Sequence, residues 1–598
     1  MRRAIQLGIG LLFGIASMSL QVSAATPTLE AASASATPPL PRVLSDTDAD
    51  LYNRIFLAQI DGKWKQADRL SAKVSDRRLL GHVRHQRYMH PTAYRSRYPE
   101  LHHWLLAYAD HPGAVRIYRL AKQRHLKNWK RPTAPKRPVI SKQARRMEDR
   151  DRAAVDRQKP SPGARKIRLP RWLRVNIHSY LRRGRPDLAD KYIHSKKVRR
   201  AIGTRRLDRA RSLVATGYLR AGKDQKALDL AAMAAKRSRD RVPSADRIAG
   251  LAAWRAGLGD RATHHFSQLA RSETAGGRNR AAGAYWAART LLRDGDARQV
   301  RQFLELAAAH PRTLHGLLAC RQLAMTPALQ WQTPVLDDAQ LAALMTLPAV
   351  QRAVALSEAG RPHLADAELG YLRRHAPPGV RRALFGLAVR LPAPAVALRM
   401  AKTTLSNGGP YYDVALYPLL GLAATEKLGL DRALIHAFVR QESDFNARAR
   451  SRVGARGLMQ ILPSTASFVG ADRSLKWSKR ANLYDPAVNL DLGDKYLAHL
   501  LTIDPINGDL IRLVAAYNGG PGNLRKWLRR MGQQNDPLFF LETIPSRETR
   551  FFTERVLTNL WIYRQRLGQP QPSLDDLAAG RWPRYESASG RTRPVARN

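Results

Sequence analysis

The sequence predicts a mostly α-helical protein in which an α-solenoid of stacked helix pairs precedes a second, compact helical domain. Three observations support this fold class. Ala, Leu and Arg dominate the chain, and alternating runs of β-branched residues are scarce. Helix pairs marked by a glycine recur through the middle of the chain. Clusters of proline and glycine within residues 391–410 then interrupt the pattern before a last helical segment begins.

The N-terminus has the pattern of a secretory signal peptide. Two arginines precede an apolar run over residues 7–20, and residues 22–24 (VSA) supply a cleavage site. We therefore expect residues 1–24 to be a signal peptide and residues 25–44, rich in Ala, Ser, Thr and Pro, to be a flexible leader. The alternative is a membrane anchor, but the apolar run is too short to cross a bilayer. The sole cysteine is Cys320, so no cysteine stands directly after the apolar run, where it could carry a lipid anchor. We therefore expect a soluble mature protein without stable membrane insertion.

Residues 45–390 are predicted to form the α-solenoid. A helix-ending pattern, Tyr-Leu-Arg-x-Gly or a variant of it, recurs there, and each glycine is followed by a polar turn and a second apolar helix. Gly184, Gly222, Gly259 and Gly295 are spaced by 38, 37 and 36 residues. One helix pair cannot bury its apolar face alone, so this regular spacing favours stacked pairs over a chance likeness of Ala-rich helices.

Four more segments complete the predicted organisation. A basic insertion at about 127–170, rich in proline, should be disordered. Residues 391–410 should be a linker region, and residues 411–568 should form the compact helical domain. Residues 569–598 should be a basic tail.

The charge of the chain indicates a polyanionic partner or environment. Lys and Arg number 102 against 48 Asp and Glu, a formal net charge of +54. Nucleic acid is the first candidate for such a chain. The secretory leader argues against it, as does an aromatic content of only 7%, which offers few surfaces for stacking bases. We therefore expect no nucleic-acid partner.

The compact domain opens with a helix that ends in an acid. Asp431 is a plausible N-cap, and Ile435, Phe438, Val439 and Glu442 follow at three- and four-residue steps, so they share one face. A carboxyl group at the end of an apolar stripe would be partly desolvated. Its pKa would then rise, and it could serve as a general acid near neutral pH. The alternative is an ordinary surface glutamate at a frayed helix end.

Four motifs give this acid a context. They are ESDFN at residues 442–446, SRVGARGLMQILP at 451–463, AAYNGGPG at 515–522 and IPSRETR at 544–550. Their combination and order resemble the soluble lytic transglycosylases of Gram-negative bacteria. That family has a lysozyme-like catalytic domain behind a ring-shaped α-superhelix. The resemblance covers residues 411–568 and implies a periplasmic enzyme whose partner is the glycan strand of peptidoglycan, with no cofactor.

The resemblance also implies a role for single residues. The matching positions are Glu442 as the catalytic residue, Ser451 and Gln460 in the sugar site, Tyr517 against the reacting sugar, Asn518 in the same motif, and Glu548 in the groove. Glu442 would first protonate the β-1,4 bond between N-acetylmuramic acid and N-acetylglucosamine as a general acid. It would then act as a general base while a 1,6-anhydromuramic end forms.

A second carboxylate would indicate a different mechanism, since ordinary glycosidases use two. Asp444, Asp472 and Asp485 are the nearby candidates. Asp444 lies two positions beyond Glu442, which on a helix points it roughly 200° away. Asp485, in Tyr-Asp-Pro, looks like a turn residue. The sequence therefore favours a single catalytic carboxyl.

Two alternatives stay open at this point. One is a lysozyme-type hydrolase that acts through water. The other is a non-catalytic peptidoglycan-binding scaffold whose solenoid recruits other cell-wall enzymes. A metal site is not expected, because the sequence has no Cys/His cluster, no HExxH motif and no calcium loop.

Overall fold

The computed structural model describes residues 40–90, 92–145, 147, 167–531 and 535–588. The described residues are mostly α-helical, and apart from isolated β-bridges no strand occurs among them. The fold class predicted from the sequence is thus confirmed. Among these residues no single helix is long and apolar enough to cross a bilayer. Two consecutive helices, Asp338–Met345 and Pro348–Glu358, reach that length and apolar content only when they are taken together, and the chain bends sharply between them.

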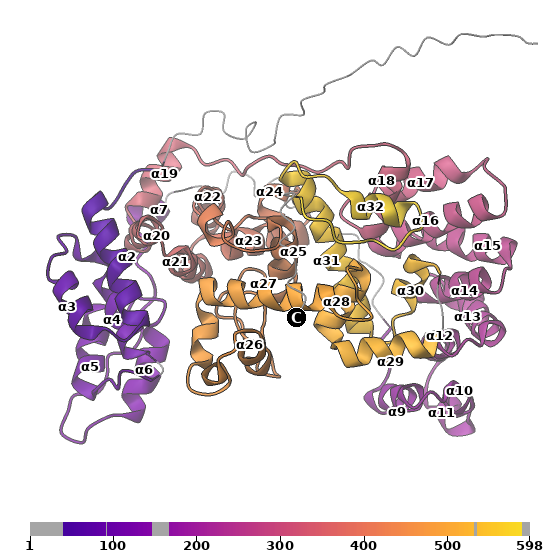
Figure 1. Cartoon of the computed structure of the whole chain (residues 1–598), viewed down its shortest axis with the longest axis horizontal. Helices are drawn as coiled ribbons and strands as arrows, with labels where there is room; N and C mark the ends of the chain where they lie inside the picture. The colour runs from indigo at the N-terminus through magenta and orange to yellow at the C-terminus, as the bar shows by residue number, and fades with distance from the viewer. Residues whose placement is uncertain (1–39, 91, 146, 148–166, 532–534, 589–598) are drawn as a thin grey trace, which may run out of the picture.

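Helices of the first part of the chain build the solenoid, which occupies both sides of the view in Figure 1. In chain order they are α2 (Asp46–Ile60), α3 (Trp64–Ser71), η1 (Arg77–Leu79), α4 (Leu80–Tyr88), α5 (Tyr98–Ala107), α6 (Ala114–Gln123), α7 (Lys142–Arg145), α9 (Arg171–Arg182), α10 (Pro186–Ile193), α11 (Lys196–Ala201), α12 (Thr204–Arg220), α13 (Asp224–Ser238), α14 (Ser244–Arg255), α15 (Gly259–Ala270), α16 (Gly277–Arg293), α17 (Val300–Ala308), α18 (Leu314–Gln322), α19 (Asp338–Met345), α20 (Pro348–Glu358), α21 (Pro362–His375), α22 (Pro378–Arg390) and α23 (Pro394–Ser406).

Elements of the second part lie between the two sides of the solenoid in Figure 1. They are α24 (Asp413–Leu416), η2 (Leu422–Ala424), α25 (Arg432–Ser443), α26 (Pro463–Val469), η3 (Arg473–Lys476), η4 (Arg480–Tyr484), α27 (Pro486–Thr502), α28 (Leu510–Gly519), α29 (Pro521–Met531), α30 (Pro537–Thr543), α31 (Arg547–Arg566) and α32 (Pro572–Ala578).

Stacking of consecutive helices is clearest from α12 to α18, where each helix packs against the next. Glycines in the left-handed backbone region make the turns inside the pairs, at Gly184, Gly222, Gly257 and Gly295. In the third pair the turn residue is Gly257 and not Gly259, which is the first residue of α15. The true spacings are therefore 38, 35 and 38 residues.

The two ends of the solenoid meet. The backbone N–H groups of Val43 and Leu44 donate to the Glu358 carboxylate at the end of α20, and His82 of α4 bonds Glu368 of α21. Helices α2–α6 thus lie beside α19–α21, although some 300 residues of chain separate them (Figure 1). Of the predicted leader, Leu44 is buried; residues 1–39, with the predicted signal peptide, lie outside the described residues.

Part of the predicted disordered insertion is packed instead. The backbone carbonyls of Lys130 and Lys136 accept hydrogen bonds from Tyr98 and Tyr371, and α7 packs on α19 and α22. These contacts anchor residues 127–145, because tyrosine hydroxyls satisfy backbone groups that have no helix of their own. Residues 146 and 148–166 lie outside the described residues.

Two other segments differ from the sequence prediction. The predicted linker 391–410 contains α23, which buries Val396 and Leu398 against its neighbours. Pro394 stands at the first position of that helix, where proline starts a helix and does not break it. The predicted tail contains α32, which packs on α18 and buries Leu574 and Leu577. An amphipathic pattern too short to be recognised forms a helix there because an apolar surface is available to it. Residues 589–598 are not described.

Candidate active site

Helix α25 carries Glu442 in its last turn, as its cap and its apolar face require. The Asp431 carboxylate caps the helix by accepting from the backbone N–H of Leu434 at 2.9 Å, and Arg564 holds the same carboxylate at 3.1 Å. Ile435, Phe438 and Val439 are fully buried, and α31 packs along the helix. The stripe predicted from the sequence thus fixes the helix and leaves Glu442 half-buried at its end.

The pKa of the Glu442 carboxyl is raised to about 8. Burial is the main cause, because it disfavours the charged form, and the negative charge of Glu548 adds to it. Among the described residues, no hydrogen bond or ion pair to the Glu442 carboxyl stabilises its ionised form. A carboxyl group in this state keeps its proton at neutral pH and can give it to a bound ligand.

Tyr517, on α28, belongs to the same site. Its hydroxyl donates to the backbone carbonyl of Met459 at 2.7 Å, and its ring lies 4.6 Å from the Phe438 ring and stacks on Phe552. Burial raises its pKa well above the ordinary value, and the negative charge of Glu442 raises it further. Because its hydroxyl proton is directed to Met459, the hydroxyl oxygen is left as an acceptor toward a ligand.

Ser451 and Gln460 shape the loop that follows α25. The Ser451 Oγ accepts from the backbone N–H of Ala455 at 3.0 Å. The Gln460 Nε2 donates to the carbonyls of Ala449 and Gly457, at 3.1 and 2.8 Å, and holds a left-handed backbone at φ 49°. Both side chains are half-buried, so each orders the loop and can present its remaining acceptor oxygen to a ligand.

Asn518 of α28 and Glu548 of α31 lie where these two helices meet, and within the described residues only Asn518 bonds the neighbouring helix. The Asn518 Oδ1 accepts from the Thr549 hydroxyl at 2.8 Å, and Thr549 in turn donates its backbone N–H to the N-cap Ser546. Glu548 is exposed and close enough to influence Glu442 electrostatically. Asn518 therefore positions neighbouring elements, whereas Glu548 acts on the site through its charge.

Sequence reasoning missed Asn489, a buried residue of α27. Its Oδ1 accepts from the backbone N–H of Met459 at 2.8 Å, and its Nδ2 donates to the carbonyls of Arg456 and Leu483 at 2.9 Å each. This amide holds the backbone that Tyr517 and Gln460 depend on. The available signal was a single amide within an apolar helical run, which is costly to bury without such partners.

The three rival carboxylates are used elsewhere. Asp444 lies beyond the end of α25 in the left-handed region, at φ 50°, and its exposed carboxylate pairs with Lys402 at 2.6 Å. Asp444 is therefore not part of the helix, in contrast to the expectation. Its carboxylate is nevertheless directed to Lys402, as the expectation of a single catalytic carboxyl requires. Asp472 caps η3 and Asp485 caps α27 through backbone N–H groups. Within the described residues, Glu442 is thus the one acid with a raised pKa next to Tyr517.

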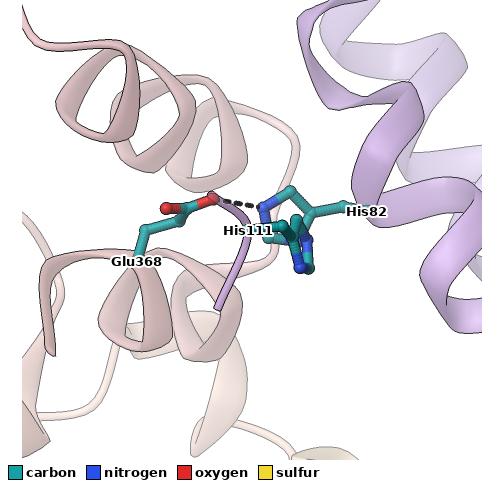
Figure 2. Close-up of side chains that lie close together, drawn as sticks. All are labelled: His82, His111 and Glu368. Carbon is teal, nitrogen blue, oxygen red and sulfur yellow. Dashed lines mark hydrogen bonds and ion pairs between the residues drawn. The ribbon is translucent and has the colours of Figure 1, made fainter. Parts of the chain in front are cut away.

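The described residues contain one group that could geometrically hold a metal ion, formed by His82, His111 and Glu368 (Figure 2). Its hydrogen bonds do not fit that role. The Glu368 carboxylate is already bonded to His82 at 2.7 Å and to Arg352 at 2.7 Å. The His111 Nδ1 accepts from the backbone N–H of Gly113, so its Nε2 carries the proton. Ligating histidines usually show the opposite pattern, and the Arg352 charge opposes a cation. The group fits a buried ion-pair network that joins the two ends of the solenoid.

The domain that holds this site is similar to domains of known proteins. Residues 420–540 match the family model described as the transglycosylase SLT domain. The chain is 38% identical over 149 residues to the soluble lytic murein transglycosylase of Escherichia coli K12, a match covering 25% of this chain and 22% of that protein. It is 34% identical over 152 residues to a putative soluble lytic murein transglycosylase of Haemophilus influenzae, 25% of each chain. The sequence match thus spans about a quarter or less of the length of these relatives.

The structural likeness extends further. The X-ray structure of an inactive mutant of the lytic transglycosylase Slt from Pseudomonas aeruginosa superposes with a TM-score of 0.52 at 21% identity, and the match covers 88% of this chain and 82% of that one. At 21% identity the comparison shows a shared fold and no more. Because it covers 88% of this chain, the shared fold includes the solenoid as well as the compact domain. The matched domain supports the resemblance seen in the four motifs: residues 420–540 match a transglycosylase SLT domain and are similar to those of soluble lytic murein transglycosylases, and the fold is shared with the Slt structure.

Proposed function

We propose that this protein is a peptidoglycan lytic transglycosylase. It cleaves the β-1,4 bond between N-acetylmuramic acid and N-acetylglucosamine and leaves 1,6-anhydromuramic ends. The observation that carries the proposal is the half-buried Glu442 carboxyl, with its pKa raised to about 8, beside Tyr517 in an SLT domain. Because the matched region is a fraction of the named relatives, activity and substrate remain proposals for this chain.

The first chemical step uses the proton of Glu442. It passes to the glycosidic oxygen, and the bond from that oxygen to C1 of the muramic residue breaks. The 2-acetamido oxygen of the same residue closes on C1 from the opposite face. The Tyr517 oxygen, whose own proton is directed to Met459, accepts the acetamido N–H and stabilises the positive charge that develops there.

The second step uses the carboxylate left on Glu442. It removes the proton of the C6 hydroxyl, and the C6 oxygen displaces the acetamido oxygen from C1. Glu442 ends protonated, and no water is consumed. A pKa near the working pH suits a group that must give a proton in one step and take one in the next. Ser451, Gln460 and Glu548 would hold the sugars around this centre.

Digestion of purified sacculi by the parent protein and by Glu442→Gln tests the proposal. We expect the parent to release fragments with anhydro ends and the variant to be slower by ~10²–10⁴-fold, the usual contribution of a general acid–base group. Asp444→Asn is the control and should keep parental activity, because Asp444 pairs with Lys402. Reducing ends, heavier by one water, would instead identify a hydrolase, and binding without cleavage would favour a scaffold.

We also propose a periplasmic location, supported by the sequence pattern of residues 1–24 and by the soluble murein transglycosylases it resembles. Other cell-wall enzymes are proposed partners of the solenoid. Cell fractionation with N-terminal sequencing of the mature protein tests the location. An N-terminus that retains residues 1–24 would contradict cleavage after Ala24.

A further inference from the structure

Helices α9, α10 and α11 form a basic surface at one end of the stacked helices. α9 packs on α10 and α12, whereas α7, the preceding helix of the described chain, packs on α19 and α22. In Figure 1 the three helices lie together at the lower edge of the molecule, below α12. The first pair of a helical stack has one face without a neighbouring pair, and such a face is usually polar. We refer to residues 168–206, which contain α9, α10, α11 and the start of α12, as the basic cap.

The basic cap has a large excess of positive charge. It contains thirteen Lys and Arg residues against two acids, Asp187 and Asp190, and all thirteen basic side chains are exposed. Both acids are engaged by residues outside the cap. Asp187 pairs with Lys223 at 2.6 Å, and Asp190 accepts a hydrogen bond from the Tyr218 hydroxyl at 3.0 Å. Within the part of the chain that the structure describes, none of the thirteen cations forms an ion pair.

Apolar side chains are exposed among these cations on α9. Leu173 is buried against the solenoid, whereas Val175, on the opposite side of the helix, is 50% exposed. Arg171 and Arg182 stand four and seven residues from Val175 and share its face. Trp172, beside that face, is 41% exposed. A polar face that ends a stack needs the arginines but not the tryptophan. Arginine together with exposed tryptophan is typical of segments that lie at the surface of a bilayer.

The cations of the basic cap act on one another and are suited to phosphate. Partial burial, followed by the positive charges of Arg174 and Arg182, lowers the pKa of His178. Because these cations repel one another, a layer of anions above them is stabilising. Ten of the thirteen are arginines, and a guanidinium group binds phosphate through paired N–H donors. The surface therefore fits an extended array of phosphates better than one small anion.

We propose that the basic cap docks on the headgroups of an anionic phospholipid bilayer. The arginines bind lipid phosphates, and Trp172 and Val175 enter the layer of headgroups. This docking is peripheral and reversible, because α9 has 12 residues, too few to span a bilayer, and its buried side holds it to the solenoid. Since charged residues are depleted from the centre of protein interfaces, the cap fits a lipid surface better than an acidic protein.

Sedimentation with vesicles tests this proposal. The parent protein should bind vesicles of mixed phosphatidylglycerol and phosphatidylcholine but not vesicles of phosphatidylcholine alone, and added salt should weaken the binding steeply. The double variant Arg171→Gln with Arg182→Gln should bind about 30-fold more weakly, the scale of two cations lost from an anionic membrane surface. Lys65→Gln with Arg69→Gln is the matched control, because both residues are exposed cations of α3, on the other side of the molecule (Figure 1). This control should bind as the parent does.

Tryptophan fluorescence distinguishes a bilayer from other polyanions. Lipids with brominated acyl chains should quench part of the parent's fluorescence, and this part should be missing in Trp172→Phe. Parental binding by the Arg171 and Arg182 double variant, equal binding to uncharged vesicles, or the same quenching in Trp172→Phe would overturn the proposal. So would tighter binding of polyglutamate, a soluble acidic chain, than of the vesicles. Glu442→Gln should bind vesicles as the parent does, so a failure of the proposed cleavage would leave this inference unaffected.

Discussion

Glu442 combines partial exposure with a pKa raised to about 8, and this combination makes its titration visible in the reaction. The first step needs the protonated form, so we expect turnover to fall as the pH rises through about 8. In Glu548→Gln one negative charge next to Glu442 is lost, which lowers the pKa of Glu442. The alkaline limb should therefore move to lower pH, as rates of anhydro-fragment release between about pH 5 and pH 10 would show. An unmoved limb would mean that Glu548 does not act on Glu442.

The raised pKa of Glu442 also makes the stability of the protein depend on pH. The unfolded chain has an ordinary glutamate pKa near 4.5, whereas the native pKa is about 8, so the native state binds the proton more tightly. The stability of the parent should therefore decline as the pH rises between these two values. Glu442→Gln lacks this decline, and above pH 8 it should be more stable than the parent by on the order of 1–3 kcal/mol. Urea unfolding at about pH 4 and about pH 9 measures the difference, which should be near zero at the lower pH.

Tyr517 acts through one oxygen. Tyr517→Phe keeps the ring packed on Phe438 and Phe552 but removes the acceptor for the acetamido group. Activity should fall by about 10–100-fold with the melting temperature lowered only slightly, because the buried Met459 carbonyl loses one donor. Tyr496→Phe is the control, because the Tyr496 ring lies 5.4 Å from the Tyr517 ring. This variant should remain active. Equal losses in the two variants would point to packing and not to catalysis.

At the scale of elements, local patterns predicted some helices and misread others. The cap, the apolar stripe and the acid of α25 were all visible in the sequence, because each depends on residues within one or two turns. The prolines near residue 394 predict a break, but Pro394 starts α23, because proline is disfavoured only inside a helix and is common at its first position. Helix α32 has seven residues, and its two buried leucines have a partner surface only in the folded protein. Short elements stabilised by tertiary contacts leave little trace in the sequence.

A test of α32 follows from its packing. Leu577 is 2% exposed, so Leu577→Ala should destabilise the protein by about 2–4 kcal/mol, through lost burial and the cavity it leaves. Asp575→Ala, on the same helix, removes a surface ion pair with Arg321 and should change stability by no more than about 0.5 kcal/mol. Denaturant unfolding of both variants gives the comparison. Parental stability of Leu577→Ala would show that this segment is a free tail after all.

At the scale of the whole molecule, part of the basic excess is neutralised inside the protein. Solenoid arginines pair with acids of the second part of the chain, and the pairs are Arg247 with Glu542, Arg278 with Glu554, Arg289 with Asp536, and Arg312 with Asp413. No local pattern predicts such pairs, since the partners are 101 to 295 residues apart. The sequence therefore predicted the two parts and the proposed site, but not the junction between the two parts.

The pair of Arg247 and Glu542 is the most buried of these, with bonds of 2.5 and 2.6 Å to the two carboxylate oxygens. Arg247→Ala should lower stability by about 3–5 kcal/mol, because it leaves a buried carboxylate without its partner. The double variant Arg247→Met with Glu542→Gln removes both charges and should recover most of that loss. Thermal unfolding of the single and double variants measures these differences in stability. A double variant as unstable as the single one would mean that the side chains matter through shape and not through charge.

Asp444, Phe445 and Gln460 hold left-handed backbones, with φ of 50°, 65° and 49°, although none is glycine. Each such residue costs on the order of 1–3 kcal/mol and persists only while its surroundings enforce it. All three lie within residues 444–460, the loop proposed to shape the sugar site, so this one loop combines three unfavourable backbone conformations. On warming, the protein should therefore lose the geometry of this loop while its helices are still intact, and cooling should restore it without refolding of the whole chain.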